Sequence, residues 1–294
     1  MYLNGQAPKP SRAGLRVLSA KPRLSANPTV FATSGSMQLG KSDDPDDDIL
    51  YMEMLKRLVR FLAKNGRVYY GDAILPRGVT DIAKTKQARI IAGDIFGKHE
   101  VTDKIADVRL LLAPLALEDV KTVRCLGLNY ALHAKESKLP IPKYPVLFCN
   151  DVPESKALDY VLGYAVGNDV SQREWQIQRG GGQWSLGKGF DGWAPYGPGI
   201  VSPELIKDPQ GLRISTKLNG ETVQESNTED MIFNVKQAIS FLSRGTTLLP
   251  GDFIFTGTPS GVGMGREPKL WMKDGDVVEV ALEGVELARI SHFK

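Results

Sequence analysis

Two side chains in residues 125–136 could act together as an acid–base pair. An apolar run predicts a strand that ends at Gly127, and a short helix after it places His133 and Glu136 three residues apart on one face. A carboxylate beside an imidazole raises its basicity and fixes its tautomer, which a base that activates water requires. A surface ion pair on a helix would have the same spacing. The other two histidines, His99 and His292, have no comparable neighbours.

A second polar group follows the mostly apolar residues 163–168, which predict another strand. Asp169 comes directly after them, and Arg173 and Gln176 follow at helical spacing. A carboxylate at a strand end can bind a hard cation, while Arg and Gln can bind a substrate carboxylate. The same residues also fit an Asx turn that precedes a helix with solvated polar side chains. The spacing alone leaves both interpretations open.

Two glycine-rich segments complete the set of candidates. Lys188 lies in residues 187–192, where a lysine could stabilise an enolate or bind a carboxylate, although a plain flexible loop has the same composition. Thr258 lies in residues 256–263, a hydroxyl- and glycine-rich turn suited to binding an anion through backbone N–H groups. The glycine spacing there is not that of a dinucleotide-binding loop, and no helical apolar pattern follows it.

Strands and hairpins are expected to position these segments. Asn-Gly or Glu-Gly pairs between strand-like runs predict three hairpins, at residues 58–70, 212–224 and 277–290, the first with a type I′ turn. Helical spacing predicts two helices, at residues 151–164 and 235–245. Many strands with few helices favour an α+β fold with a large mixed or antiparallel sheet system.

Three regions are expected along the chain. Residues 1–50 form a leader that has no acidic residue before position 43 and carries several Lys, Arg and Ser. This composition is typical of a mitochondrial transit peptide, but four prolines before residue 29 favour a disordered tail or wrongly included upstream sequence. Residues 51–119 are expected to form a small N-terminal β-rich domain, and residues 120–294 a second domain that carries the four polar segments.

Taken in order, the four segments resemble the fumarylacetoacetate hydrolase family from about Val123 to Ser291. Each string is weak alone, but four in the same order are specific. The matching residues are Gly127-Leu128-Asn129-Tyr130 with His133 and Glu136; Asn168-Asp169-Val170-Ser171 with Arg173, Trp175 and Gln176; Lys188; and Thr256-Gly257-Thr258-Pro259.

This resemblance implies a fold, a reaction and residue roles. The fold is a β-rich mixed-sheet roll, usually a homodimer, and the chain is most similar to the acylpyruvase and oxaloacetate decarboxylase-like branch. Members of this family use Mg²⁺ or Mn²⁺ to hydrolyse or decarboxylate small 2-oxo and 1,3-diketo acids. The implied metal ligand is Asp169, and the implied catalytic residues are His133, Glu136 and Lys188. The implied substrate-binding residues are Arg173, Gln176 and Thr258.

One part of the family pattern is missing. The two carboxylates that complete the metal site come from a Glu-x-Glu pair, and no such pair occurs between Phe148 and Asp169. Asn150, where the family has a lysine, runs directly into Asp151, as if a few tens of residues were absent. We expect a skipped exon or shortened splice form, because the other catalytic positions are intact. The alternative is a catalytically impaired member that acts as a binding or structural protein.

Composition limits the partners. A net charge of +3 is too small to indicate nucleic-acid binding, and no apolar run approaches the roughly 18–20 residues that cross a bilayer. Two cysteines cannot form a disulfide framework, which favours an intracellular protein, cytoplasmic or mitochondrial. The expected partner is therefore a small 2-oxo acid.

Overall fold

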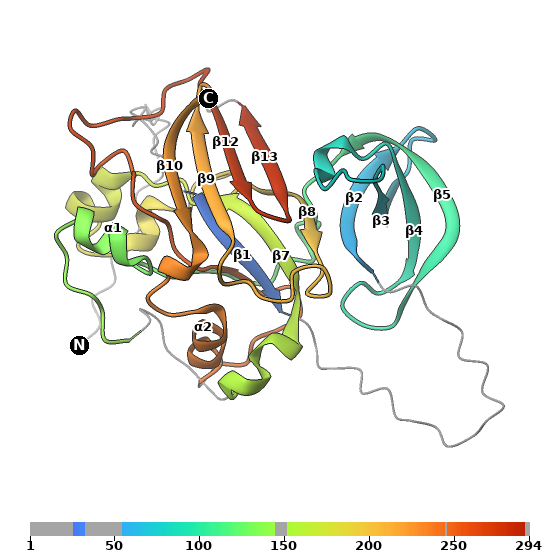
Figure 1. The fold of residues 1–294 in the computed structure, drawn as a ribbon, viewed down its shortest axis with the longest axis horizontal. Helices are drawn as coiled ribbons and strands as arrows, with labels where there is room; N and C mark the ends of the chain where they lie inside the picture. Colours follow the sequence, from blue (N-terminus) through green and yellow to red (C-terminus); the bar gives the residue numbers. More distant parts are fainter. Residues whose placement is uncertain (1–25, 33–54, 145–151, 245, 292–294) are drawn as a thin grey trace, which may run out of the picture.

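The computed structural model describes residues 26–32, 55–144, 152–244 and 246–291 (Figure 1). The strands are β1 (Ala26–Ala32), β2 (Arg57–Ala63), β3 (Val68–Ile74), β4 (Gln87–Gly93), β5 (His99–Leu111), β6 (Val123–Cys125), β7 (Val161–Asn168), β8 (Tyr196–Val201), β9 (Arg213–Leu218), β10 (Glu221–Asn227), β11 (Phe253–Phe255), β12 (Val277–Leu282) and β13 (Glu286–Ser291). The helices are α1 (Ala131–Glu136), α2 (Val235–Leu242), the short 3₁₀ helices η1 (Ile82–Lys84), η2 (Glu154–Tyr160), η4 (Trp184–Gly187) and η5 (Thr228–Asp230), and the π-helix η3 (Glu174–Arg179). The predicted α+β class, rich in strands, is confirmed. Within the described residues, no helix is long and apolar enough to cross a membrane.

The larger sheet has nine strands in the order β3-β4-β5-β2-β8-β7-β1-β11-β6. Since β3 also pairs with β2, the strands β2 to β5 close on themselves, as the right-hand unit of Figure 1 shows. The pairing of β2 with β8, at Arg57 and Leu58, joins this closed unit to the rest of the sheet. The domain boundary expected at residue 119 stays a prediction.

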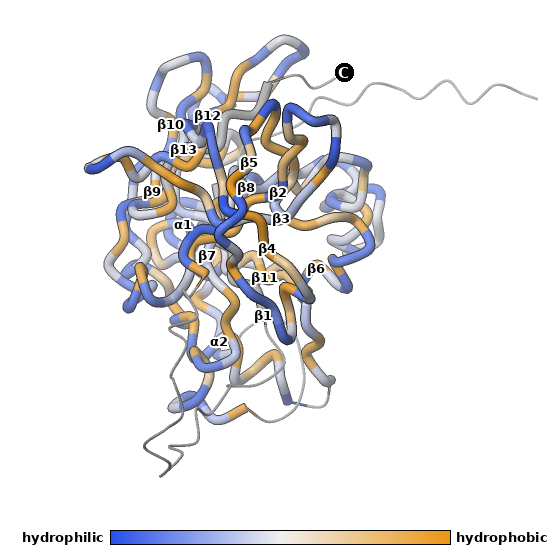
Figure 2. Tube along the Cα trace, turned by 90° about the vertical axis from the view of Figure 1, so that its right-hand side faces the viewer, coloured by the Kyte–Doolittle hydropathy of each residue, from blue (hydrophilic) through white to orange (hydrophobic). Residues whose placement is uncertain are grey.

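The smaller sheet has four strands in the order β10-β9-β12-β13 and packs against the β8-β7-β1 part of the larger one. Fully buried side chains such as Tyr164, Ile214 and Val278 meet between the two sheets in one apolar core. Figure 2 shows that apolar and hydrophilic stretches alternate through the strands, with an apolar stretch along β11. A second buried apolar cluster includes Ile200 on β8 and Phe253 and Phe255 on β11. The loops that connect these strands are where polar groups for a site are expected.

The three predicted hairpins are confirmed, but their turns differ in type. At Asn219-Gly220 both residues have positive φ, as a type I′ turn requires. At Asn65-Gly66 and at Glu283-Gly284 the glycine alone has positive φ. The type I′ prediction for Asn65-Gly66 is therefore wrong. The turn instead closes through the Ala63 amide, which donates to the Arg67 carbonyl at 2.8 Å.

One predicted helix is confirmed and the other is largely wrong. Helix α2 begins with a capping box in which Asn234 and Gln237 satisfy each other's backbone amides. Residues 151–164 do not form the expected single helix. Their described part is the 3₁₀ helix η2, followed by β7 from Val161 onward. Strand β7 lies between β8 and β1 and is buried on both faces, so its continuous apolar run resembles a helix in sequence.

Strand β1 comes from the region expected to be a leader. It lies between β7 and β11 and runs antiparallel to both, with Thr29 level with Ala165 on one side and Phe255 on the other. Without it, two neighbouring strands would each have a row of unpaired backbone groups, which is unfavourable inside a sheet. The expectation for residues 1–50 is thus not met at these seven positions, and its remainder lies outside the described residues.

Replacing Thr29 with proline should destabilise the protein. A strand residue between two partners donates its amide to one of them, and proline has no amide to donate. We expect the Thr29→Pro variant to lose about 1–3 kcal/mol of unfolding free energy in urea titrations followed by circular dichroism. The Thr29→Ser variant keeps the amide and is the control. Equal stability of the two variants would contradict the placement of β1.

Candidate active site

Three of the four sequence segments emerge at one edge of the larger sheet. Strands β6 and β11 are parallel. Strand β1 is antiparallel to both β7 and β11, so β7 runs in the same direction as β11. The carboxyl ends of β6, β7 and β11 therefore share an edge, and residues 126–136, 169–176 and 256–263 follow them there. The topology thus gathers polar groups that are up to about 130 positions apart in the sequence.

The predicted acid–base pair forms on helix α1. The Nδ1 atom of His133 lies 3.3 Å from Oε2 of Glu136, and the two side chains are 9% and 17% exposed. With a carboxylate at Nδ1, the neutral imidazole carries its proton on that nitrogen and leaves Nε2 as the basic atom. This is the arrangement that a water-activating base needs.

The glycine-rich turn holds the carboxylate of this pair. The Gly261 amide donates to both oxygens of Glu136, at 3.1 Å each. Gly261 has a φ of +97°, and a Cβ there would lie 2.2 Å from the Val223 carbonyl oxygen, so the turn requires glycine. A Cβ on Gly265 would lie 2.5 Å from the Glu136 Oε1 atom. The first and fourth sequence segments are therefore in direct contact.

Two residues that the sequence analysis did not single out stabilise this turn. The buried Gln224 on β10 donates through Nε2 to the Pro259 carbonyl at 2.9 Å and to Oγ1 of Thr258 at 3.2 Å. Arg266 donates to the carbonyl oxygens of Gly261 and Val223. The pairing of β10 with β9 brings Gln224 to the turn, and no local pattern in the sequence indicates it.

Lys188 and Asp169 form a second polar centre. The Lys188 Nζ atom lies 2.5 Å from Oδ2 of Asp169 and also donates to Oγ of Ser171 at 2.8 Å. The side chains of Lys188 and Asp169 are 21% and 13% exposed. The predicted metal ligand and the predicted enolate-stabilising lysine are thus brought together and pair with each other.

Arg173 and Gln176, both predicted to bind substrate, also contact each other. Nη1 of Arg173 donates to Oε1 of Gln176 at 2.7 Å. The Nε atom of Arg173 is buried without a partner among the described residues. Burial lowers the pKa of the Arg173 guanidinium, and the nearby Asp169 carboxylate raises it. An arginine stays charged in proteins, so Arg173 adds a second positive charge beside Asp169.

Cys125, at the end of β6, lies near the Asp169 and Lys188 pair. Burial raises the pKa of its thiol to about 12, with Asp169 raising it further and Lys188 lowering it. Two residues on, a Cβ on Gly127 would lie 2.9 Å from the Trp184 ring, just before Lys188. Residues 125–136 therefore reach from the Asp169 and Lys188 pair to Glu136. The thiol stays protonated near neutral pH and is no candidate nucleophile.

These residues do not make a metal site. Among the described residues there is no group of three or more His, Cys, Asp or Glu that could hold an ion. Mg²⁺ and Mn²⁺ prefer six oxygen ligands, and the Asp169 carboxylate is already paired with an ammonium group. The junction of Asn150 and Asp151, where the Glu-x-Glu segment is expected to be missing, lies outside the described residues.

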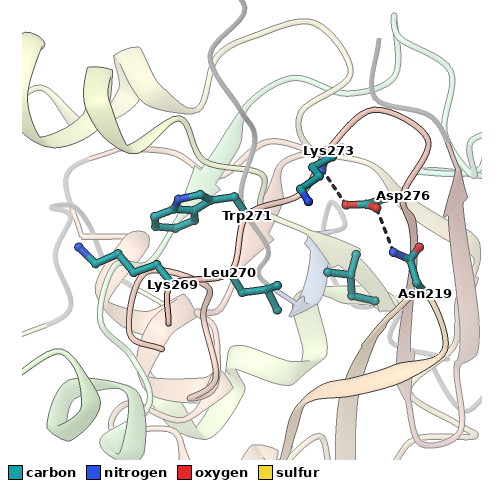
Figure 3. A pocket seen from close by; sticks show the side chains of 7 residues that line it. Asn219, Lys269, Leu270, Trp271, Lys273 and Asp276 are labelled. Carbon is teal, nitrogen blue, oxygen red and sulfur yellow. Dashed lines mark hydrogen bonds between the residues drawn. The ribbon is translucent and has the colours of Figure 1, made fainter. Parts of the chain in front are cut away.

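A separate hollow is lined by Leu218, Asn219, Lys269, Leu270, Trp271, Lys273 and Asp276 (Figure 3). It contains none of the predicted site residues. The Asp276 carboxylate there accepts from Nδ2 of Asn219 at 2.9 Å and from the Lys273 amide at 2.7 Å. Its charge is therefore used to close two adjacent turns.

Comparison with known proteins identifies the family. The model of the fumarylacetoacetate (FAA) hydrolase C-terminal family matches residues 149–290. The solved structure of 2-hydroxyhepta-2,4-diene-1,7-dioate isomerase from Mycobacterium marinum is 32% identical, with a TM-score of 0.65, and the match covers 80% of this chain and 96% of that one. The chain belongs to the fumarylacetoacetate hydrolase family.

Two further relatives of this chain bear on its length and on metal use in the family. The fumarylacetoacetate hydrolase domain-containing protein 2 homolog of Dictyostelium discoideum is 42% identical over 204 residues, which cover 54% of this chain and 67% of the relative. Since 54% of this chain is about 159 residues, fewer than the 204 that are aligned, a few tens of the relative's residues have no counterpart here. The fumarylpyruvate hydrolase of Pseudomonas aeruginosa, solved with Mn²⁺ and pyruvate, is 29% identical with a TM-score of 0.51, covering 58% of this chain and 89% of that one. Divalent metals thus occur in the family.

Replacing Gln224 with methionine should loosen the turn that holds Glu136. The change leaves the Pro259 carbonyl and the Thr216 hydroxyl without their partner in a buried site. We expect the Gln224→Met variant to lose about 1–3 kcal/mol of unfolding free energy in urea. The Gln87→Met variant, which removes an exposed hydrogen bond to Asp107, is the control and should change stability by less than about 0.5 kcal/mol. Similar losses in both would argue against a special role for Gln224.

Cys125 should react slowly with alkylating agents. In a Cys149→Ser background it is the one remaining cysteine. A pKa of about 12 leaves very little thiolate at pH 8, because each unit below the pKa reduces it tenfold. We expect iodoacetamide, followed by mass spectrometry, to react about 1,000-fold faster in urea than with the folded protein. Rates within tenfold of each other would contradict the burial of the thiol beside Asp169.

Proposed function

We propose that the protein hydrolyses a carbon–carbon bond in a small 2-oxo or 1,3-diketo acid, with an acylpyruvate as the representative substrate. The observation that carries the proposal is the contact between His133 and Glu136, with the carboxylate held by the Gly261 amide. The relation to a fumarylpyruvate hydrolase supports the substrate class. Oxaloacetate decarboxylation is the related reaction of the same site, and it needs no water.

In the proposed reaction, the pair of His133 and Glu136 activates water, and Lys188 stabilises the enolate that forms. The imidazole of His133 removes a proton from water at Nε2, and the water oxygen attacks the acyl carbonyl carbon. The bond between that carbon and the methylene group then breaks, and its electron pair forms the enolate of pyruvate. The Lys188 ammonium stabilises the enolate oxygen, and the proton held by His133 returns to the methylene carbon. The products are a carboxylic acid and pyruvate.

Arg173, Gln176 and Thr258 are the proposed contacts for substrate oxygens. Arg173 can donate from its buried Nε, which has no partner among the described residues. Gln176 orients Arg173 by accepting from Nη1. Thr258 is held in place by Gln224 in the turn after β11. The homodimer that the family resemblance implies stays a prediction.

The resemblance also implies Mg²⁺ or Mn²⁺ as the cofactor, with Asp169 as a ligand. The described residues do not fit this group, so no step of the proposed reaction depends on it. The same observation favours a second candidate function. The protein would then be a catalytically impaired member of the family that binds small acids, or acts as a structural protein, without turning them over.

Acetylpyruvate turnover by the wild-type protein, and its loss when His133 is replaced with alanine, distinguishes the two functions. We expect the His133→Ala variant to lose about 10²- to 10⁴-fold in kcat for acetylpyruvate, because the general base is gone. Turnover is followed by the loss of the substrate's enol absorbance. The Lys135→Ala variant, altered at an exposed position of the same helix, is the control and should retain full activity. If the wild-type protein did not turn over acetylpyruvate, the hydrolase proposal would be wrong and the binding function would be favoured.

A further inference from the structure

The ion pair of Lys188 and Asp169 occupies the position at which the family resemblance implies a metal. The ammonium nitrogen lies 2.5 Å from the carboxylate and 2.8 Å from the Ser171 hydroxyl. Both charged side chains are mostly shielded from water, where attraction between opposite charges is stronger than at an exposed surface. The negative charge of Asp169 is therefore already neutralised within the chain.

Arg173 makes this centre positive. Its guanidinium is close enough to Asp169 to interact with it electrostatically, and its Nε is buried without a partner in the described part of the chain. Asp169, Lys188 and Arg173 thus carry a combined charge of +1. A net positive charge with an unused N–H donor favours binding of a carboxylate.

A divalent cation would bind unfavourably at this positively charged centre. Among the described residues it would have one carboxylate ligand, Asp169, and it would have to displace the Lys188 ammonium group to reach it. It would then lie beside two fixed positive charges, which repel it at short range. Retained water molecules can complete the coordination of Mg²⁺, but they do not offset this repulsion.

We propose that the Lys188 ammonium group takes the place of the divalent cation in this chain, so that a small dicarboxylate or 2-oxo acid binds at Lys188 and Arg173 without metal. This inference rests on the proposed function, because it assigns the Asp169 centre to the same acid substrates. It concerns binding and not turnover, so the two can fail separately.

Oxalate is a suitable probe, because its planar pair of carboxylates resembles the enolate of pyruvate. We expect the full-length protein, treated with EDTA, to bind oxalate in isothermal titration calorimetry. Saturating Mn²⁺ should change that Kd by less than about twofold. In parallel, the electron paramagnetic resonance signal of free Mn²⁺ should not decrease when the protein is added. Oxalate binding that requires Mn²⁺, or no oxalate binding under either condition, would overturn the proposal.

Two substitutions at Asp169 and Lys188 distinguish an ammonium-based site from a metal-based one. The Asp169→Asn variant should retain or tighten oxalate binding in EDTA, because it raises the local charge, whereas a metal-based site would lose binding with this residue. The Asp169→Asn/Lys188→Met double variant removes both partners of the ion pair and leaves the combined charge of the centre at +1, as in the wild-type protein, so it should stay folded. Its oxalate affinity should fall at least about tenfold.

An exposed ion pair supplies the control. Lys156 lies 3.5 Å from Asp159, and these side chains are 67% and 46% exposed. The Asp159→Asn/Lys156→Met variant should bind oxalate as the wild-type protein does. If the double variant at Asp169 and Lys188 bound oxalate equally well, the assignment to Lys188 would be wrong. Acetylpyruvate turnover that depends on Mn²⁺, together with Mn²⁺-dependent oxalate binding, would support the proposed function and reject this inference.

Discussion

The pairing of β1 with β7 and β11 is the constraint on which the rest of the structure depends. These strands bring the carboxyl ends of β7 and β11 to one edge, and the parallel pairing of β6 with β11 adds a third. Every predicted site residue except Lys188 follows one of these three ends. Backbone groups inside a sheet need hydrogen-bond partners. The positions of the site residues therefore depend on the pairing of these strands.

The two polar centres at this edge differ in how they are held. Glu136 is positioned by a backbone amide in a turn that requires glycine at position 261, so the acid–base pair is fixed by the fold itself. Asp169 is held by a side chain, Lys188, from a loop that is mostly exposed. The first centre therefore depends on backbone contacts, whereas the second depends on the balance of charge among Asp169, Lys188 and Arg173.

Family membership and metal use are separate matters in this chain. The matches to the isomerase of Mycobacterium marinum and to the C-terminal family model concern the fold, which the chain retains. Metal binding in such a fold depends on several carboxylates that converge on one point. Here the described residues bring one carboxylate to that point together with an ammonium group, and this contact is the basis of the proposal that the centre binds acids without metal.

The sequence by itself determined the hairpins, helix α2 and the spacing of His133 and Glu136, because these depend on neighbours a few residues apart. It did not determine that residues 161–168 form a strand, since a run buried on both faces resembles a helix. Nor did it indicate β1, Gln224 or the pairing of Lys188 with Asp169. Those contacts join segments up to about 225 positions apart, and only the tertiary structure decides which distant partners meet.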